Sequence, residues 1–206
     1  MVDIGLNKFS KFTSKIQNLE KQYAMDCTTS INNAKLLGLG TIPYSKHVLH
    51  KPLTKKLLKE YLIDQYTLDF PIEYARFLKI YNGLNLFRVK ITTPKFSFAY
   101  GLFTIYGLPL TPPFARSKGE EQPFDVRIEG LSKHKNLPES WFKFAAYVNP
   151  NEIDIIYELF IDTTTNNVYS CERKKAEIIQ QWSDLESCLC EIFDSYASIA
   201  DEYFKE

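Results

Sequence analysis

Apolar residues recur at helical spacing between residues 69 and 83 of the chain, DFPIEYARFLKIYNG. Pro71 suits the first helical turn, where its missing N–H has no partner to lose. Asn82 and Gly83 tolerate a positive φ, which is a common way for a helix to end. The segment therefore predicts a short capped helix over 71–82. Its apolar stripe follows the i, i+3, i+4, i+7 rhythm and faces a core: Tyr74, Phe77, Leu78 and Tyr81.

Two other helical regions precede this helix. Residues 1–40 form a basic amphipathic extension in which Phe9, Phe12 and Ile16 follow a three- and four-residue rhythm. Such a helix can bind a membrane surface or a partner, but packing onto its own domain is the more frequent case. We expect this extension to be dispensable for the fold of the main domain, residues 41–206. Within that domain, Thr54 is a candidate cap for a helix over 55–62.

The periodicity changes to two after the short helix. Residues 86–92 alternate between apolar and polar and predict a half-buried strand, followed by a longer strand over 96–106. Residues 125–129 alternate again, as an edge strand with outward charges would. Residues 153–161 and 168–171 predict a hairpin around a turn that is rich in Asp, Thr and Asn.

The last long element is a predicted helix over 178–203. Its apolar positions are spaced 4, 3, 4, 3, 4, 3 and 4 residues apart, so they form one unbroken stripe. Trp182 lies on this stripe, and we expect it to be a core residue together with Phe77 and Leu78. The spacing also fits a coiled coil, but the bulky Trp and Tyr side chains favour packing across a sheet.

The residue patterns of several segments resemble those of the SUKH superfamily. The first segment combines Pro71, the pair Phe77-Leu78 and the pair Asn82-Gly83, and Tyr106-Gly107-Leu108 fits a later family strand loosely. Residues 137–145 resemble the family's Pro-led second element. Asp162 and Val168-Tyr169 match the family hairpin, although Asn166-Asn167 replace its usual glycine. The matching segments span roughly residues 53–200. This resemblance, with the periodicities, implies an α+β fold: a mainly antiparallel twisted sheet with N-terminal helices and a long C-terminal helix packed on it.

Charge is unevenly distributed along the chain. The 206 residues carry no net charge, yet the first 59 residues hold ten lysines and three acidic residues. The last 57 residues hold four basic and thirteen acidic residues. The molecule is expected to be dipolar, which steers charged partners, unless both ends are ordinary solvated faces. The lysines come without a recognition motif for nucleic acid, so direct nucleic-acid binding is not expected.

The sequence also indicates in which cellular compartment the protein is found. The N-terminal sequence lacks the apolar stretch of a signal peptide, and the uncharged stretch 96–115 is interrupted by prolines and glycines. A cytoplasmic protein without membrane attachment is therefore expected, and a monomer is favoured. The four cysteines have no framework spacing, so free thiols are the expected state: Cys27, Cys171, Cys188 and Cys190.

Signals for catalysis are weak. Gly38 and Gly40 begin a dinucleotide-type loop, but Pro43 occupies the position of the third glycine. His47 and His50 have a spacing that could share a metal, although no third ligand is identified. No nucleophile lies in a recognisable catalytic motif. We therefore expect a protein that is not an enzyme and that uses no cofactor or metal.

The resemblance implies a function in protein binding. Bacterial members of the superfamily are largely immunity proteins that neutralise polymorphic toxins, including nucleases and deaminases, and fungal members include regulators of cell-wall synthesis. The favoured hypothesis is an immunity protein whose partner is a cognate toxin. A regulatory scaffold, an enzyme with an unrecognised site and a domain with no toxin partner are the alternatives. Glu152, Asp154 and Glu158 would form an outward acidic face that binds a basic toxin cleft, unless these charges serve only solubility.

Overall fold

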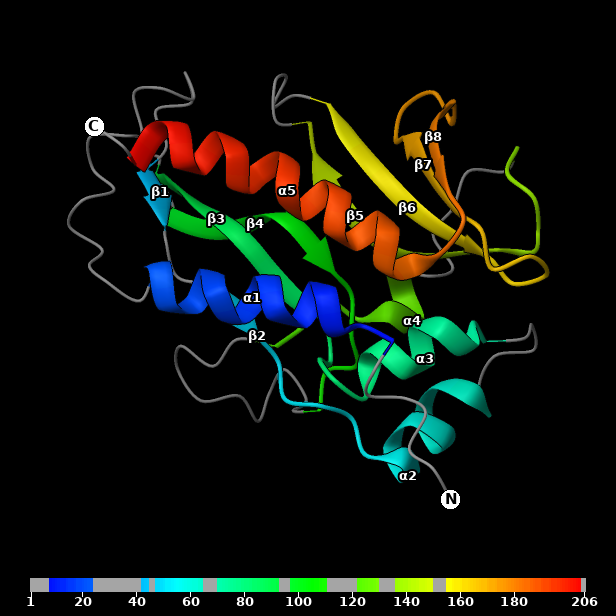
Figure 1. Cartoon of the computed structure of the whole chain (residues 1–206). Helices are drawn as coiled ribbons and strands as arrows, with labels where there is room; N and C mark the ends of the chain where they lie inside the picture. Colours follow the sequence, from blue (N-terminus) through cyan, green and yellow to red (C-terminus); the bar gives the residue numbers. More distant parts are fainter. Residues whose placement is uncertain are drawn as a thin grey trace.

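The computed structural model describes residues 8–23, 42–44, 47–64, 70–92, 97–110, 122–129, 136–149 and 155–204. Strands and helices together give an α+β fold, as predicted (Figure 1). The helices are α1 (Ser10–Tyr23), α2 (Lys55–Leu58), α3 (Ile72–Leu78), α4 (Val126–Glu129) and α5 (Leu185–Phe204), and a π-helical turn, Lys59–Ile63, continues α2. The strands are β1 (Ile42–Tyr44), β2 (Val48–Leu49), β3 (Leu84–Thr92), β4 (Ser97–Ile105), β5 (Trp141–Val148), β6 (Ile156–Asp162), β7 (Val168–Glu172) and β8 (Ile178–Trp182).

Every pairing between these strands is antiparallel, in the order β1-β3-β4-β5-β6-β7-β8, with β2 also on β3. From β3 onward each strand pairs with the next strand along the sequence, which is the simplest connection for an antiparallel sheet. The predicted hairpin is confirmed by β6 and β7, whose turn holds Asn166 at φ +61°. Asparagine accepts this left-handed conformation more readily than most residues, so it can replace a glycine here.

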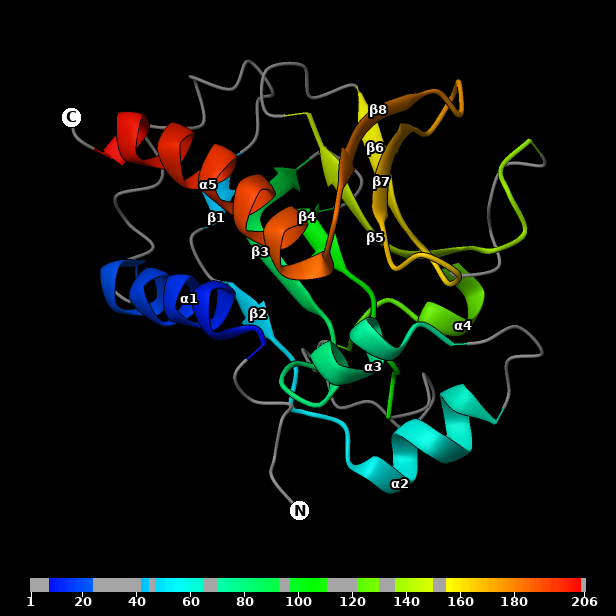
Figure 2. The same cartoon turned by 45° about the vertical axis from the view of Figure 1, so that its right-hand side comes forward.

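Helices α1 and α5 lie side by side over β3 and β4 and run in the same direction (Figures 1 and 2). Phe12 of α1 contacts Phe193 of α5 with ring centroids 6.1 Å apart. The Lys15 ammonium lies 2.6 Å from the Asp194 carboxylate. Glu186 accepts the backbone N–H of Lys11 at 2.9 Å, so a side chain of α5 satisfies a donor in the first turn of α1.

The basic N-terminal helix therefore belongs to the main core. Phe9, Phe12 and Ile16 are fully buried in the same apolar cluster as the rest of the chain. The sequence suggested a segment that only extends the domain, but Phe9 and Phe12 pack on Phe77 of α3, and Phe12 also packs on Phe193 of α5. The boundary at residue 40 lies outside the described residues.

Helix α3 occupies the predicted place. Pro71 is its N-cap residue, and Phe77 and Leu78 are buried, which confirms the expected core positions. The helix ends at Leu78, earlier than predicted, and the Lys79 and Ile80 N–H groups donate to carbonyls three residues back, as in a 3₁₀ turn.

The turn after α3 depends on Asn82 and Gly83. Gly83 has φ +80°, as predicted, and a Cβ atom there would lie 2.8 Å from the carbonyl oxygen of Ile105. The Asn82 side chain donates to the Leu108 carbonyl at 2.8 Å and accepts the Leu108 N–H at 2.7 Å. These two residues therefore hold the entry of β3 against the exit of β4.

Strand β3 departs from simple alternation. It begins at Leu84, and both Leu84 and Leu86 are buried. Phe87 has φ +50°, a left-handed conformation that is strained for a bulky residue. Its ring stacks on Tyr196 of α5, with centroids 5.1 Å apart. Phe87 therefore packs on the same core as its neighbour Leu86, which a regular strand would prevent.

The predicted C-terminal helix is too long. Residues 178–182 form strand β8 on β7, and the helix begins only at Leu185. Asp184 marks the start of the helix, because its carboxylate accepts the Ser187 N–H at 2.8 Å in the geometry of a helix N-cap. Trp182 is nevertheless buried, as expected, but from the sheet and not from the helix.

The predicted edge strand over 125–129 is also wrong, because α4 occupies this segment. The Asp125 carboxylate accepts the Arg127 N–H at 3.0 Å and pairs with its guanidinium at 2.7 Å. Local side-chain bonds of this kind favour a turn over a sheet ladder. None of the helices in the described residues combines the length and the apolar character needed to cross a bilayer.

Candidate functional site

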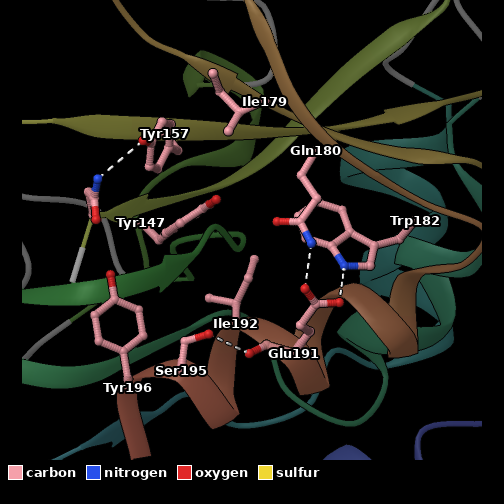
Figure 3. Close-up of a pocket in the computed structure, with 10 residues that line it drawn as sticks. Tyr147, Tyr157, Ile179, Gln180, Trp182, Glu191, Ile192, Ser195 and Tyr196 are labelled. Atoms are coloured by element: carbon pink, nitrogen blue, oxygen red, sulfur yellow. Dashed lines mark hydrogen bonds between the residues drawn. The ribbon is translucent and has the colours of Figure 1, made fainter. Parts of the chain in front are cut away.

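A pocket of about 180 Å³ lies between α5 and the strands β5, β6 and β8 (Figure 3). Helix α5 begins just after β8 and crosses the sheet (Figure 2). Aromatic side chains contribute much of the lining of the pocket. The lining residues are Tyr147, Asn149, Tyr157, Ile179, Gln180, Trp182, Glu191, Ile192, Ser195 and Tyr196.

One carboxylate joins the two walls of this pocket. The Trp182 Nε1–H donates to Glu191 Oε2 at 2.8 Å, and the Gln180 side-chain amide donates to Glu191 Oε1. Both donors come from β8 and the acceptor comes from α5 (Figure 3). Hydrogen bonds to a charged group are stronger than neutral ones, so Glu191 fixes the last strand on the helix.

The tyrosine hydroxyls at the pocket are all satisfied within the protein. The Tyr147 hydroxyl lies 2.9 Å from the Ser170 hydroxyl, and Tyr196 donates to backbone carbonyls of β4 and β5. The Asn149 amide donates to the Tyr157 hydroxyl at 3.2 Å. Burial raises the pKa of Tyr147 to about 12, although its hydrogen bond with Ser170 opposes this shift. The pocket therefore offers neutral aromatic surface.

Strand β8 borders the pocket and is the last strand in the sheet order of the described residues. Ile178 is 54% exposed and Ile179 is 47% exposed. A register shift between Ser170 and Cys171 of β7 faces these two residues, as in a β-bulge. Ala176, with φ +56°, lies in the turn just before β8. The bulge and the turn together leave two large apolar side chains at the surface.

A cluster of charged side chains lies between the strands and α4, with Lys143 and Glu158 buried at its centre. The Lys143 ammonium lies 3.3 Å from Glu158 and 3.4 Å from Glu129, and Arg173 donates to Glu158 at 2.9 Å. Lys143 is only 1% exposed. Burial, with Glu129 and Glu158 nearby, raises the pKa of Tyr106 in the same group. We call Lys143, Glu129, Glu158 and Arg173 the charge cluster.

The charge cluster changes the interpretation of the proposed acidic face. Glu158 was expected to point outward, but it is 8% exposed and its carboxylate is held by Lys143 and Arg173. The expectation of an outward Glu158 is therefore wrong. Glu152 and Asp154 lie outside the described residues, and the binding role of this face stays a prediction.

The remaining residues of the sequence motif support the β6–β7 hairpin. Asp162 accepts the backbone N–H and the hydroxyl of Thr164 at 2.9 and 2.7 Å. Burial alone would raise the pKa of Asp162, but these and neighbouring hydrogen bonds outweigh it and lower the pKa. Val168 is buried, and Tyr169 stacks on Trp141 with ring centroids 4.2 Å apart. The structure thus gives these residues contacts within the fold.

The candidate metal and thiol residues have ordinary surroundings. His47 Nδ1 accepts the Phe87 N–H at 3.0 Å. Within the described residues, no group of three or more His, Cys, Asp or Glu side chains could hold a metal ion. Cys171, Cys188 and Cys190 are free thiols, and Cys27 lies outside the described residues. Burial raises the pKa of the Cys171 thiol to about 11, which keeps it protonated and unreactive.

A wider groove of about 450 Å³ lies along α5 beside Lys11 of α1. Its carboxylates already serve the fold, because Glu186 accepts N–H groups of α1 and Asp194 pairs with Lys15. The pocket beside β8 is therefore the stronger candidate. Sequence reasoning missed it, since its residues come from distant segments and three of them, Ile179, Gln180 and Trp182, were wrongly assigned to the C-terminal helix.

Comparisons of the chain with protein-family models, with curated proteins and with solved structures found no match. The site must therefore be interpreted from its own geometry.

Proposed function

We propose that this chain is a non-enzymatic protein-binding domain, and that it acts as an immunity protein that neutralises a cognate toxin in the cytoplasm by direct binding. The observation that carries the proposal is the exposed apolar edge formed by Ile178 and Ile179 beside the aromatic pocket. Aromatic and apolar side chains that remain accessible in a folded domain are typical of the centre of a protein interface.

The polar side chains favour binding over catalysis. The charge cluster and Glu191 are occupied by ion pairs and hydrogen bonds within the fold. A catalytic group needs a nucleophile, a base or an electrophilic donor within reach of a substrate. At the pocket, the hydroxyls of Tyr147, Tyr157 and Tyr196 have partners inside the protein. The surface left for a partner is apolar and aromatic.

The toxin as partner rests on the sequence resemblance to the SUKH superfamily. In support, the capped helix before the sheet, the positive φ at Gly83 and the C-terminal helix across the sheet follow the order that the resemblance implies. The strongly acidic last 57 residues suit a basic partner, and toxins that act on nucleic acid present basic clefts.

Co-expression tests the proposal. The reading frame upstream of this gene is examined for a long protein with a variable C-terminal domain, and that domain is expressed in cells with and without the chain. We expect cell death without the chain, survival with it, and a stable complex on size-exclusion chromatography. Death at the same rate with the chain present, or a housekeeping operon upstream, would contradict the proposal.

A further inference from the structure

We propose that the partner docks as an extended segment that pairs with the outer edge of β8 and inserts one bulky apolar side chain into the pocket between β8 and α5. This inference rests on the proposed function and deepens it, since it names the binding surface and the kind of segment that binds. Because acidic side chains surround the pocket, the partner segment should also carry basic residues beside its apolar side chain.

The edge of β8 lacks two of the usual protections against pairing, charged side chains and proline, and its one protection is the bulge at Ile179. Its five residues, Ile178–Trp182, contain no charged side chain and no proline. Natural edge strands normally carry lysine, proline or another blocking feature, because the unpaired N–H and C=O groups accept any extended chain. No strand in the described part of the chain pairs with β8 on the side away from β7. A fold that leaves such an edge beside two exposed isoleucines is suited to strand addition.

The size of the pocket selects a side chain. Pockets that bind small molecules or cofactors usually measure about 300–1,000 Å³. The pocket beside β8 measures about 180 Å³, which is too small for such a ligand and suits one large residue. It opens next to the edge, because Ile179 and Gln180 of β8 are among its lining residues (Figure 3). A strand paired with β8 would carry one of its side chains over this opening.

The chemistry of the lining selects an apolar or aromatic residue. The rings of Tyr147 and Tyr157 lie 5.1 Å apart and present carbon surface. Both oxygens of Glu191 already accept hydrogen bonds from β8. The Ser195 hydroxyl donates to a backbone carbonyl of its own helix. A polar side chain entering the pocket would lose its water and compete with these internal hydrogen bonds, whereas an apolar one gains from burial.

The charge of the segment excludes a second copy as the best occupant. From Ala176 to Phe204 the chain has seven acidic residues and no basic residue. The turn just before this range holds three basic residues, of which Arg173 pairs with Glu158 and Lys175 pairs with Glu172. Two copies that paired through β8 would bring these carboxylates together, and like charges facing across an interface cost several kcal/mol. A foreign segment with Lys or Arg beside its apolar residue gains attraction from the same carboxylates.

The experiment selects binders from a display library of random ten-residue peptides against the full chain. We expect enriched peptides with one bulky apolar residue and flanking Lys or Arg. Affinity should fall at least tenfold when Ile179→Lys blocks the edge and when Ser195→Trp fills the pocket. Each variant has a matched control: Ile128→Lys changes another exposed isoleucine, and Ser198→Trp changes an exposed serine on α5 outside the pocket. Both controls should keep the affinity within twofold.

Three results would overturn the inference. The first is the absence of any enriched peptide, or enrichment of peptides without the apolar and basic residues. The second is equal binding by the two test variants and their controls. The third is a dimer in sedimentation experiments that Ile179→Lys dissociates, because the occupant would then be a second copy. In the toxin assay, full protection by both test variants would reject this surface while leaving the proposed function intact. If the parent chain bound the peptides but gave no protection against the toxin, only the toxin as partner would be rejected.

Discussion

Two groups of polar side chains lie on opposite faces of strands β5–β8, and their surroundings differ. Lys143 follows Phe142 and precedes Phe144, which both lie in the main core, so alternation directs its side chain to the other face. There Lys143 and Glu158 of the charge cluster are buried and pair with each other and with the more exposed Glu129 and Arg173. On the helix face, Glu191 holds β8 and α5 together but leaves an accessible pocket between them.

This difference distinguishes polar side chains that pair in the interior of the fold from polar side chains that border an accessible pocket. A buried ion pair contributes little net stability, but removing one partner leaves an uncompensated charge at high cost. An accessible pocket whose polar atoms are satisfied costs little to keep open and can exchange water for a ligand. If this comparison is correct, changes in the core and the charge cluster affect stability, and changes at the pocket and the β8 edge affect binding.

The largest effect is expected from removing α1. A chain that begins at Thr41 loses Phe9, Phe12 and Ile16, each of which is buried. Truncating such a side chain costs about 2–5 kcal/mol, and the whole free energy of unfolding of a domain is about 5–15 kcal/mol. We expect no cooperative melting transition by circular dichroism. A shortened chain that melts cooperatively near the parent temperature would show that α1 is an appendage, as the sequence alone suggested.

The next effect concerns the charge cluster. Lys143→Ala removes the buried ammonium shared by Glu158 and Glu129, although Arg173 still pairs with Glu158, and should cost about 3 kcal/mol in urea denaturation. The double variant Lys143→Met with Glu158→Gln removes both charges and should be clearly more stable than Lys143→Ala. A loss below about 1 kcal/mol for Lys143→Ala would mean that water reaches this face.

Gly83→Val tests the turn between α3 and β3. A left-handed conformation costs a residue with a side chain about 1–3 kcal/mol, and the Cβ atom would also meet the Ile105 carbonyl. The expected loss of unfolding free energy is at least of this size. An unchanged denaturation midpoint would show that the backbone at this residue is not left-handed.

Tyr147→Phe tests the pocket through alkaline pH. The pKa of Tyr147 in the folded protein is raised to about 12 by burial, above about 10 in the unfolded chain. The neutral phenol therefore contributes stability that is complete below pH 10 and is lost as the pH rises toward 12. Between these values the parent should lose about 2 kcal/mol more than Tyr147→Phe. Parallel pH profiles of the two proteins in chemical denaturation would contradict the buried position of this hydroxyl.

The smallest effect on stability is expected at the edge strand. Ile179→Lys changes a half-exposed side chain, and surface substitutions usually change the free energy of unfolding by less than about 0.5 kcal/mol. The same change is expected to lower the affinity for the selected peptides at least tenfold. A loss of several kcal/mol would assign Ile179 to the core and would end the contrast between the two faces.

The sequence predicted features whose signals are local. Helix α3, the positive φ at Gly83 and the β6–β7 hairpin each follow from a few adjacent residues with defined conformational preferences. The predicted helix over 178–203 failed because Ile178 and Trp182 are four residues apart, which fits a helix although both lie on β8. Asp184 was the available signal for the true helix start, since it is a strong N-cap residue.

The candidate site could not be predicted in the same way. Alternation along β6 correctly separates Glu158 from the apolar face, but it does not tell whether the other face is covered. Lys143 and Arg173, which bury the Glu158 carboxylate, come from segments 15 residues away on either side. The pocket likewise combines β5, β6, β8 and α5, and only the folded chain brings these elements together.

The contact between α1 and α5 also has a consequence for synthesis on the ribosome. Lys11 meets Glu186 and Lys15 meets Asp194, across 175 and 179 residues of chain. At about 5–20 residues per second, roughly 10–40 s pass between the synthesis of α1 and that of its partner helix. During this time Phe12 lacks Phe193, the α5 side chain that packs on its ring. Helix α1 is thus made long before its contacts with α5 can form, and this segment of the nascent chain needs protection from aggregation in the meantime.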